Sequence, residues 1–330
     1  MTPARLHSFL AIVDSGSARA AAAKLHVTES AVSASLAALQ QEVGVPLFER
    51  QGRGLGLTES GAIFASYARQ ILGLLDESAV AARSAVAPEA GRLRLGSVTT
   101  AGEYLLPGLL ASFRATFPDV EVTLEVGVRD HILHRLADHH LDVVVAGRPL
   151  TGRGMVSRAT RANSLVMVGS PEHASELGEA TWLLREPGSG TRATAMALIE
   201  SLGIDPPTLS LGSHGAVIAS AVLGLGVTLT SADAAARKLA GGELEVRPTA
   251  GTPLLRPWHL LTTTNPTPTT ALFVEHAVTG VDQDLAFEMT RKRRRSGRAE
   301  SRTPSPGQAR THEQSLPRSD SSNDVEVRVR

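Results

Sequence analysis

Two loops rich in glycine and hydroxyl side chains have the composition of anion-binding sites. Each of them, residues 96–107 and residues 185–192, follows an expected strand and opens an expected helix. Hydroxyl groups and free backbone N–H groups at a helix N-terminus bind anions, and glycine lets several amides converge. We therefore expect the loops to bind a small anion such as a carboxylate or a phosphate. The side chains expected to contact it are Ser97, Thr99, Thr100, Ser189, Thr191 and Arg192.

Each loop could instead serve only to cap its helix. Neither contains the Gly-Lys-Ser/Thr phosphate loop of nucleotide hydrolases. Their placement favours a site, because ligands of α/β sheets bind outside the carboxyl ends of the strands. If the loops close two lobes of one domain, they face each other across a cleft.

A different chemistry is expected at residues 28–43, a predicted helix whose outward face is small or polar. Short side chains let a helix enter the major groove of DNA, where hydroxyl groups reach bases or phosphates. A Gly-rich hairpin with two arginines follows this helix. The residues expected to contact DNA are Ser17, Thr28, Glu29, Ser30, Ser33, Ser35, Arg50 and Arg53.

Three short helices and a hairpin would position these side chains. Apolar residues at helical spacing, with Thr2, Ser17 and Thr28 as caps, predict three helices within residues 1–44. Two helices joined by a short turn form a helix-turn-helix candidate, and residues 47–57 are typical of a hairpin wing. Spacing alone fits any small helical bundle equally well, and the arginines could lie in a solvated loop. The polar face of the third helix favours DNA.

One long helix is predicted over residues 58–87. Its apolar stripe cannot be buried against a winged domain of about 60 residues alone, so a partner helix is expected, as in coiled coils. The alternative is packing onto the chain's own second domain. The stripe consists of Ile63, Tyr67, Ile71, Leu74 and Leu75.

Residues 91–280 alternate between strand-like and helix-like segments, which favours a mainly parallel sheet covered by helices. Residues 281–330 follow as a predicted disordered tail. Within it, residues 291–330 hold 11 Lys and Arg against 5 Asp and Glu and cannot form a core. The tail is either a nonspecific DNA-binding arm or an extension without a role.

Composition excludes several classes of protein. The chain of 330 residues has 33 Lys and Arg and 33 Asp and Glu, so attraction to DNA must be local. The absence of cysteine excludes disulfides, cysteine metal sites and a thiol nucleophile. The histidines of residues 131–140 give no clean metal face, and His214 is expected to line the cleft or cap a helix. No catalytic residue, metal or cofactor is predicted.

A regular set of positions within residues 1–85 carries a resemblance: Ser17, Ala21, Ala22, Leu25, Val27, Ala31, Val32, Ser33, Leu36, Leu39, Gly44, Leu47, Phe48, Arg50, Leu57, Thr58 and Gly61. By these positions the segment resembles the N-terminal domain of the LysR-type transcriptional regulators. The sequence departs from the family at three positions, where Phe, Gln and Pro are usual and this chain has Ala18, Glu29 and Ser30. Glu29 can accept from a cytosine amino group but repels phosphates, so a different base preference is expected.

The resemblance covers residues 1–280 and implies an α/β protein of four parts. These are a winged helix-turn-helix domain (1–57), a linker helix that dimerises (58–87), a two-lobed effector domain like periplasmic binding proteins (91–280), and the tail (281–330). Implied partners are double-stranded DNA, a small effector, RNA polymerase, and further copies in a homodimer or homotetramer.

Residues 184–192, Thr99-Thr100 and residues 104–107 are similar to the branch that includes Calvin-cycle operon regulators. That branch senses phosphorylated or otherwise anionic metabolites, and its resemblance implies an anionic effector here.

Two other functions use two-lobed α/β domains. An enzyme would need a nucleophile, or an acid and a base, converging in the cleft, and no such spacing is present. A solute-binding protein would need an export signal, and the apolar run at residues 9–13 is shorter than the 7–15 residues such a signal needs. Residues 216–229 are also too short for a membrane helix. We expect a cytoplasmic regulator.

Overall fold

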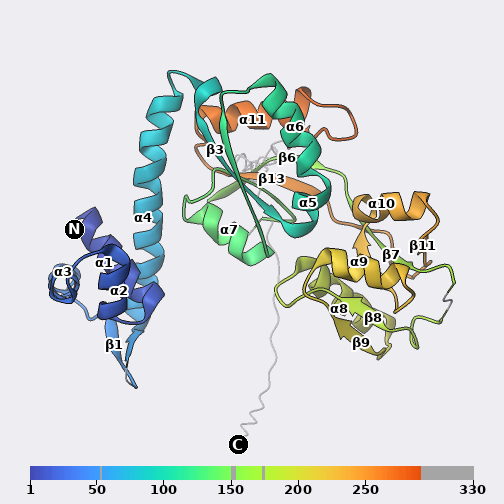
Figure 1. Cartoon of the computed structure of the whole chain (residues 1–330), viewed down its shortest axis with the longest axis horizontal. Helices are drawn as coiled ribbons and strands as arrows, with labels where there is room; N and C mark the ends of the chain where they lie inside the picture. The colour runs from blue at the N-terminus through green and yellow to red at the C-terminus, as the bar shows by residue number, and fades with distance from the viewer. Residues whose placement is uncertain (53, 150–153, 173–174, 291–330) are drawn as a thin grey trace, which may run out of the picture. The chain divides into compact units, whose positions relative to one another are not determined.

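The structure is a computed structural model that describes residues 1–52, 54–149, 154–172 and 175–290 (Figure 1). Arg53 and residues 291–330 lie outside the described residues, so the predictions for that arginine and for this part of the tail are not addressed by the structure. The prediction that the disordered tail begins at residue 281 is wrong, because Phe287 is buried in a hydrophobic core and Glu288 and Met289 pair with a strand of the effector domain.

Three helices begin the chain, and caps set their limits. The Ser17 hydroxyl accepts from Ala20 N–H at the start of α2, and the Thr28 hydroxyl accepts from Ala31 N–H at the start of α3. Thr2 occupies the N-cap position of α1 and a proline follows it, but the Thr2 side chain makes no capping hydrogen bond. The helices are α1 (Pro3–Ser15), α2 (Ala18–Leu25) and α3 (Glu29–Val43).

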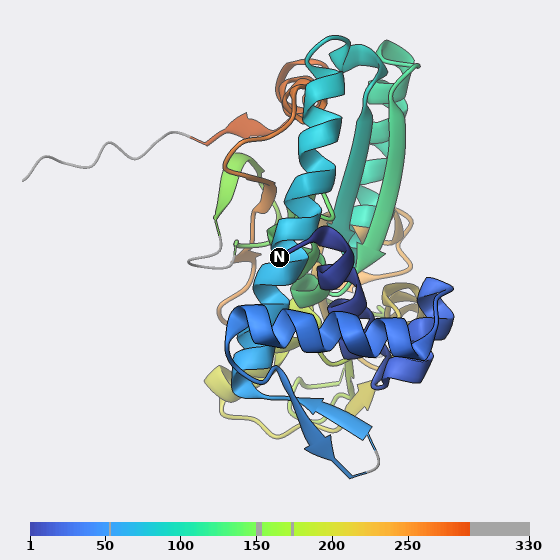
Figure 2. The same cartoon turned by 90° about the vertical axis from the view of Figure 1, so that its left-hand side faces the viewer.

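A two-stranded wing follows the third helix. Antiparallel strands β1 (Phe48–Gln51) and β2 (Gly54–Leu57) project from the helical body as a hairpin (Figure 2). Phe9 is fully buried between Phe48 and Phe64, with ring centroids 5.4 and 5.2 Å away. This small aromatic cluster ties the wing and the next helix to α1.

The long helix α4 (Glu59–Ser84) has two different faces. One is buried on the winged domain, through Ala65 and Ala68, and on the effector domain. At Gly73 a Cβ atom would lie only 2.0 Å from the Asp138 carbonyl oxygen. The predicted apolar stripe is exposed at Ile63, Tyr67, Ile71, Leu74 and Leu75, and part of it borders an open groove that Ala137 and His139 of the effector domain also line.

Ion pairs add to the contact between α4 and the effector domain. Glu77 is hydrogen-bonded to His139, and Asp76 accepts from Arg92 and Arg94 at 3.0 and 3.2 Å. Arg94 also binds the buried Asp142 at 2.6 Å. The C-terminal half of α4 is therefore fixed to the first lobe.

Lobe I is a six-stranded sheet in the order β14-β6-β13-β5-β3-β4. Helices α6 and α11 cover one face and α7 covers the other (Figure 1). Its strands are β3 (Arg92–Val98), β4 (Glu121–Gly127), β5 (Val143–Ala146), β6 (Met155–Arg161), β13 (Trp258–Thr263) and β14 (Glu288–Met289). Its helices are the 3₁₀ turn η1 (Pro88–Ala90), α5 (Thr99–Tyr104), α6 (Leu106–Thr116), α7 (Arg129–Ala137) and α11 (Pro268–Thr279).

Lobe II is built around β7, which pairs antiparallel with three strands. Helix α8 packs on one side of the core, and α9 and α10 pack on the other. The strands are β7 (Ser164–Gly169), β8 (Trp182–Leu184), β9 (Thr208–Ser210), β10 (Thr228–Ser231), β11 (Glu245–Val246) and β12 (Leu254–Leu255). The helices are α8 (Gly190–Leu202), α9 (His214–Val222) and α10 (Ala232–Ala240).

The prediction of a mainly parallel sheet is wrong. Only β3 with β4, β3 with β5, and β8 with β9 pair in parallel among the named strands. The chain crosses between the lobes twice, leaving lobe I after β6 and returning into β13. These two strands therefore run in opposite directions when they pair. Residues 99–104, expected within a loop, form the helix α5.

Replacing Gly61 by alanine should destabilise the protein by about 1–3 kcal/mol. A Cβ atom there would lie 1.9 Å from the Leu47 carbonyl oxygen, a backbone atom that must shift. Urea unfolding followed by circular dichroism measures the effect. Gly215→Ala in α9 is the matched control, because its Cβ meets nothing within 4 Å and alanine is the better helix former. Equal stability of the two variants would contradict the close packing of α4 on Leu47.

Candidate functional site

A cleft of about 60 Å³ lies between the two lobes. Its walls are the ends of β3 and β4, the starts of α5, α7 and α8, and the two crossing segments. Four predicted residues line it: Thr99 and Thr100 from lobe I, and Ser189 and Thr191 from lobe II. The structure therefore brings the two anion-binding loops together across one cleft.

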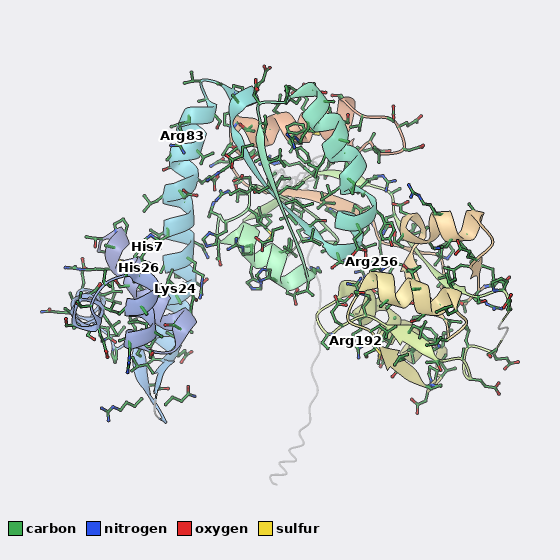
Figure 3. The ribbon with its side chains drawn as sticks, in the orientation of Figure 1. His7, Lys24, His26, Arg83, Arg192 and Arg256 are labelled. Carbon is green, nitrogen blue, oxygen red and sulfur yellow. The ribbon has the colours of Figure 1, made fainter. Side chains whose placement is uncertain are left out.

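Two predicted residues are not brought to the cleft lining. Ser97 is fully buried, and its hydroxyl donates to the carbonyl groups of Val98 and Val145. Arg192 donates to the Arg185 carbonyl oxygen and to the Ser210 hydroxyl, both at 2.7 Å. In Figure 3, Arg192 lies within lobe II.

Sequence reasoning missed the arginines that do line the cleft. They are Arg129, which opens α7, Arg185 at the end of β8, and Arg256 on the second crossing segment. Arg256 lies where the lobes meet (Figure 3), and its Nη1 donates to Thr194 at 2.7 Å. Burial, together with the charges of Arg129 and Arg148, lowers the pKa of the Arg256 guanidinium. The sequence could have indicated Arg129 and Arg185, because each is a cation that follows an expected strand.

One carboxylate balances part of this charge. Glu186 accepts two hydrogen bonds from Arg185, each at 2.7 Å. Burial raises the pKa of Glu186, but the hydrogen bonds from Arg185, a backbone hydrogen bond and the charge of Arg185 together lower that pKa below its ordinary value, so the group stays ionised. With three arginines and one glutamate in its lining, the cleft favours an anion.

His214 opens α9 and lies outside the cleft lining. It is 2% exposed, and its ring meets Tyr104 of lobe I edge to face, with centroids 5.4 Å apart. Its Nε2 has no hydrogen-bond partner among the described residues. Burial, and secondarily the charge of Arg185, lowers the pKa of His214 to about 4, so the ring is neutral. It contributes an apolar contact between the lobes.

The predicted DNA-contacting residues lie on the winged domain. Glu29, Ser30 and Ser33 are exposed on the first turns of α3, and Arg50 is exposed on the wing. Ser17 and Thr28 cap α2 and α3 and so have a structural role whether or not they touch DNA. Ser35 is half-buried on α3.

Basic side chains that sequence reasoning did not single out also belong to this domain. Lys24 and His26 are exposed at the turn between α2 and α3 (Figure 3). Lys24 lies 3.8 Å from Asp14, a loose pair that leaves the ammonium group free to meet a phosphate. At the turn of the helix-turn-helix, Lys24 thus supplies positive charge that the chain as a whole lacks.

The described residues offer no cluster of metal-ligating side chains. No group of three or more His, Asp or Glu side chains there could hold a metal ion. The histidines near α7 are instead engaged locally: His131 with Glu125, His134 with the Asp130 carbonyl, and His139 with Glu77. No helix in the described ranges is both long and apolar enough to cross a membrane.

Two family models match the chain. "Bacterial regulatory helix-turn-helix protein, lysR family" matches residues 3–62, and "LysR substrate binding domain" matches residues 87–281. The chain belongs to the LysR family. It is a LysR-type transcriptional regulator with an effector-binding domain, and the named relatives are regulators, not enzymes.

One relative connects this LysR-type regulator with the branch named above. The RuBisCO operon transcriptional regulator of Acidithiobacillus ferrooxidans is 33% identical over 265 residues, which cover 77% of this chain and 85% of the relative. This similarity confirms the resemblance to Calvin-cycle operon regulators.

Two solved structures share the fold. Full-length CbnR complexed with its target DNA has a TM-score of 0.57 and 25% identity, covering 84% of this chain and 98% of CbnR. The regulatory domain of CcmR from Synechocystis PCC6803, in complex with 2-PG, has a TM-score of 0.52 and 26% identity. It covers 56% of this chain and 94% of the CcmR domain.

The stability of this LysR-type regulator should fall as the pH is lowered from 6.5 to about 4. In that window the unfolded chain binds a proton at His214 that the folded chain excludes, which costs up to roughly 3 kcal/mol at the acid end. Urea midpoints at several pH values measure the slope. His214→Gln should flatten it, whereas His7→Gln, at an exposed position on α1, should not. An unchanged slope in His214→Gln would show that other groups govern acid unfolding.

Proposed function

We propose that this LysR-type regulator binds operator DNA through α3 and the wing and responds to a small anionic metabolite in the interlobe cleft. The observation that carries the proposal is the composition of the cleft lining. Hydroxyl groups of Thr99, Thr100, Ser189 and Thr191 face one cleft with an excess of arginine. The CcmR regulatory domain, a relative of the same fold, is bound to the anion 2-PG, which supports this reading.

Charge and hydrogen bonding contribute separately to anion binding in the cleft. Arginine supplies the attraction that concentrates an anion, and hydroxyl groups and the N-terminus of α8 supply donors at fixed positions. Because both lobes contribute donors, an anion that bridges them stabilises one separation of the lobes over another. It can shift the regulator between states only if it binds those states unequally.

For DNA contact we propose Ser17, Thr28, Glu29, Ser30, Ser33, Ser35, Arg50 and Arg53. The CbnR complex with its target DNA supports a DNA-binding role for this type of domain. The exposed hydroxyl groups of α3 would reach base edges or phosphates, and the wing arginines would pair with phosphates. Glu29 disfavours phosphate and is expected to bias base choice toward cytosine.

The exposed stripe of α4 supports a homodimer. Five large apolar side chains on one helix face remain in contact with water in the single chain. Pairing with the same helix of a second copy would bury them, as in a coiled coil. Assembly of such dimers into tetramers, contact with RNA polymerase and a cytoplasmic location complete the proposal.

Operator binding should weaken in Ser33→Ala and in Arg50→Ala. Loss of one phosphate contact at Arg50 should also reduce the salt slope by about one unit, whereas Ser33→Ala should leave that slope unchanged. Footprinting on the intergenic DNA beside the gene locates the operator, and anisotropy titrations at several salt concentrations give both quantities. Arg83→Ala, at the exposed end of α4, is the control. Unaltered affinity and slope in Arg50→Ala would remove the wing from the DNA interface.

Leu74→Glu should disrupt the dimer, because pairing would then bury a charge in the helix seam. Multi-angle light scattering measures the mass. Ala62→Glu is the matched control, since it adds the same charge to an exposed position of α4 off the apolar stripe. A mass unchanged by Leu74→Glu would place the dimer contact on another surface.

Thr99→Val should weaken binding of 2-PG about 2- to 10-fold, the effect of one lost hydrogen bond, and leave DNA affinity without effector unchanged. Calorimetry with 2-PG measures the first and anisotropy the second. Arg192→Ala is the comparison, because that arginine is held by Arg185 and Ser210 away from the cleft lining. Loss of 2-PG binding in Arg192→Ala but not in Thr99→Val would move the effector out of the cleft.

A further inference from the structure

A second groove of about 490 Å³ adjoins the effector cleft. The two cavities share Arg129, Gly190 and Arg256, and beyond these the groove has a lining of its own. It is formed by one face of α8, by the crossing segment at residues 255–257, and by Arg148 and His259 of lobe I. No residue of the loop at residues 96–107 belongs to its lining, and the loop at residues 185–192 contributes only Gly190.

Three guanidinium groups line this groove with little opposing charge. Arg129 pairs with Asp130 at 3.0 Å, and that carboxylate is itself largely exposed. Among the described residues, no carboxylate lies within 4.0 Å of a guanidinium nitrogen of Arg148 or Arg256. No Asp or Glu contributes to the lining. The groove is therefore more strongly cationic than the cleft beside it, where Glu186 offsets Arg185.

Hydrogen bonds hold two of the arginines in place. Nη2 of Arg129 donates to the Arg148 carbonyl oxygen at 2.7 Å, and Nη1 of Arg256 donates to the Thr194 hydroxyl at 2.7 Å. The charges act on one another: burial, Arg129 and Arg148 lower the pKa of Arg256, and burial and Arg148 lower the pKa of His259. Holding like charges together costs free energy, which a bound anion would recover.

The face of α8 leaves room for a ligand. Its contribution consists of Gly190, Ala193, Thr194 and Ala197, which are small, with one hydroxyl group. Larger side chains at these positions would fill the groove and cover the guanidinium groups. The space and the donors therefore occur together.

We propose that this groove is a second anion-binding site, distinct from the effector cleft, for a small molecule bearing a phosphate or carboxylate group. Arg148 belongs to this site alone, and Arg129 and Arg256 stand at its border with the cleft. An anion here would neutralise Arg129 and Arg256, which the cleft also uses. Binding of an anion at either site therefore lowers the affinity of the other site for its own anion. The regulator would then respond to its effector relative to a second anion rather than to the effector alone.

The test uses the full-length protein and inorganic phosphate as the probe, in a phosphate-free buffer of constant ionic strength. Calorimetric titrations compare the wild type, Arg148→Gln, Thr99→Val and Arg114→Gln. Arg148→Gln keeps the carbonyl group that Arg129 binds, and should weaken phosphate binding in the groove about 10-fold or more. Arg114 is an exposed arginine on α6 and serves as the matched control. Thermal unfolding confirms that each variant is folded.

The two proposals fail in different ways. Phosphate binding that is the same in Arg148→Gln as in the wild type, or that is lost only in Thr99→Val, overturns the second site and leaves the effector cleft standing. Phosphate binding lost in Arg148→Gln, with 2-PG binding intact in Thr99→Val, supports the groove and overturns the cleft. An equal loss in Arg114→Gln would show a nonspecific charge effect and also overturn the groove site.

Discussion

The two segments that cross between the lobes are tied together by one buried side chain, and the site depends on this connection. Asn163 on the first crossing donates through its side chain to the Arg256 carbonyl oxygen at 2.8 Å, and its own carbonyl accepts from Arg256 N–H at 2.8 Å. Its remaining oxygen accepts from the Ser231 hydroxyl at 2.6 Å. The side-chain amide of Asn163 and its backbone carbonyl thus all have hydrogen-bond partners. These hydrogen bonds fix the backbone from which Arg256 extends toward both cavities.

This connection explains why charge gathers where it does. The chain must pass between the lobes twice, and antiparallel pairing of β6 with β13 places both passages side by side. The ends of β3 and β4 face the same region from lobe I, and the start of α8 faces it from lobe II. Cations carried by such termini converge without any of them being adjacent in sequence. The positive field of the cleft is therefore a property of the topology as much as of composition.

Local signals in the sequence predicted most of the elements. Capping by Ser17 and Thr28 follows from their own neighbours along the chain, as does the hydroxyl content of the two cleft loops. The short helix α5 was missed because its residues carry the glycine and threonine content of a loop, and it is tertiary packing against β3 and β4 that holds it. The strand β6 and the helix α10 were not predicted either.

The charged part of the site was the least predictable. Arg192 sits in the motif and was expected in the cleft, whereas Arg256 lies in no motif and is present there. Arg192 is held by the Arg185 carbonyl oxygen of its own loop and by Ser210, 18 positions away, and Arg256 is held by Thr194, 62 positions away. Partners as distant as Ser210 and Thr194 leave no trace in local composition. A search of the sequence for arginine and lysine near each expected crossing between the lobes would have reduced the number of candidate cleft residues.

Gly73 lies against the Asp138 carbonyl group, and ion pairs hold the same contact. Lobe I and α4 therefore move together as one rigid unit. An α-helix of 26 residues is about 39 Å long, so a 5° turn of lobe I about the upper end of α4 would displace the winged domain by roughly 3 Å. That is close to the rise of one base pair along B-DNA, about 3.4 Å. The regulator could therefore change its register on DNA with a motion of the lobes far smaller than a domain rearrangement.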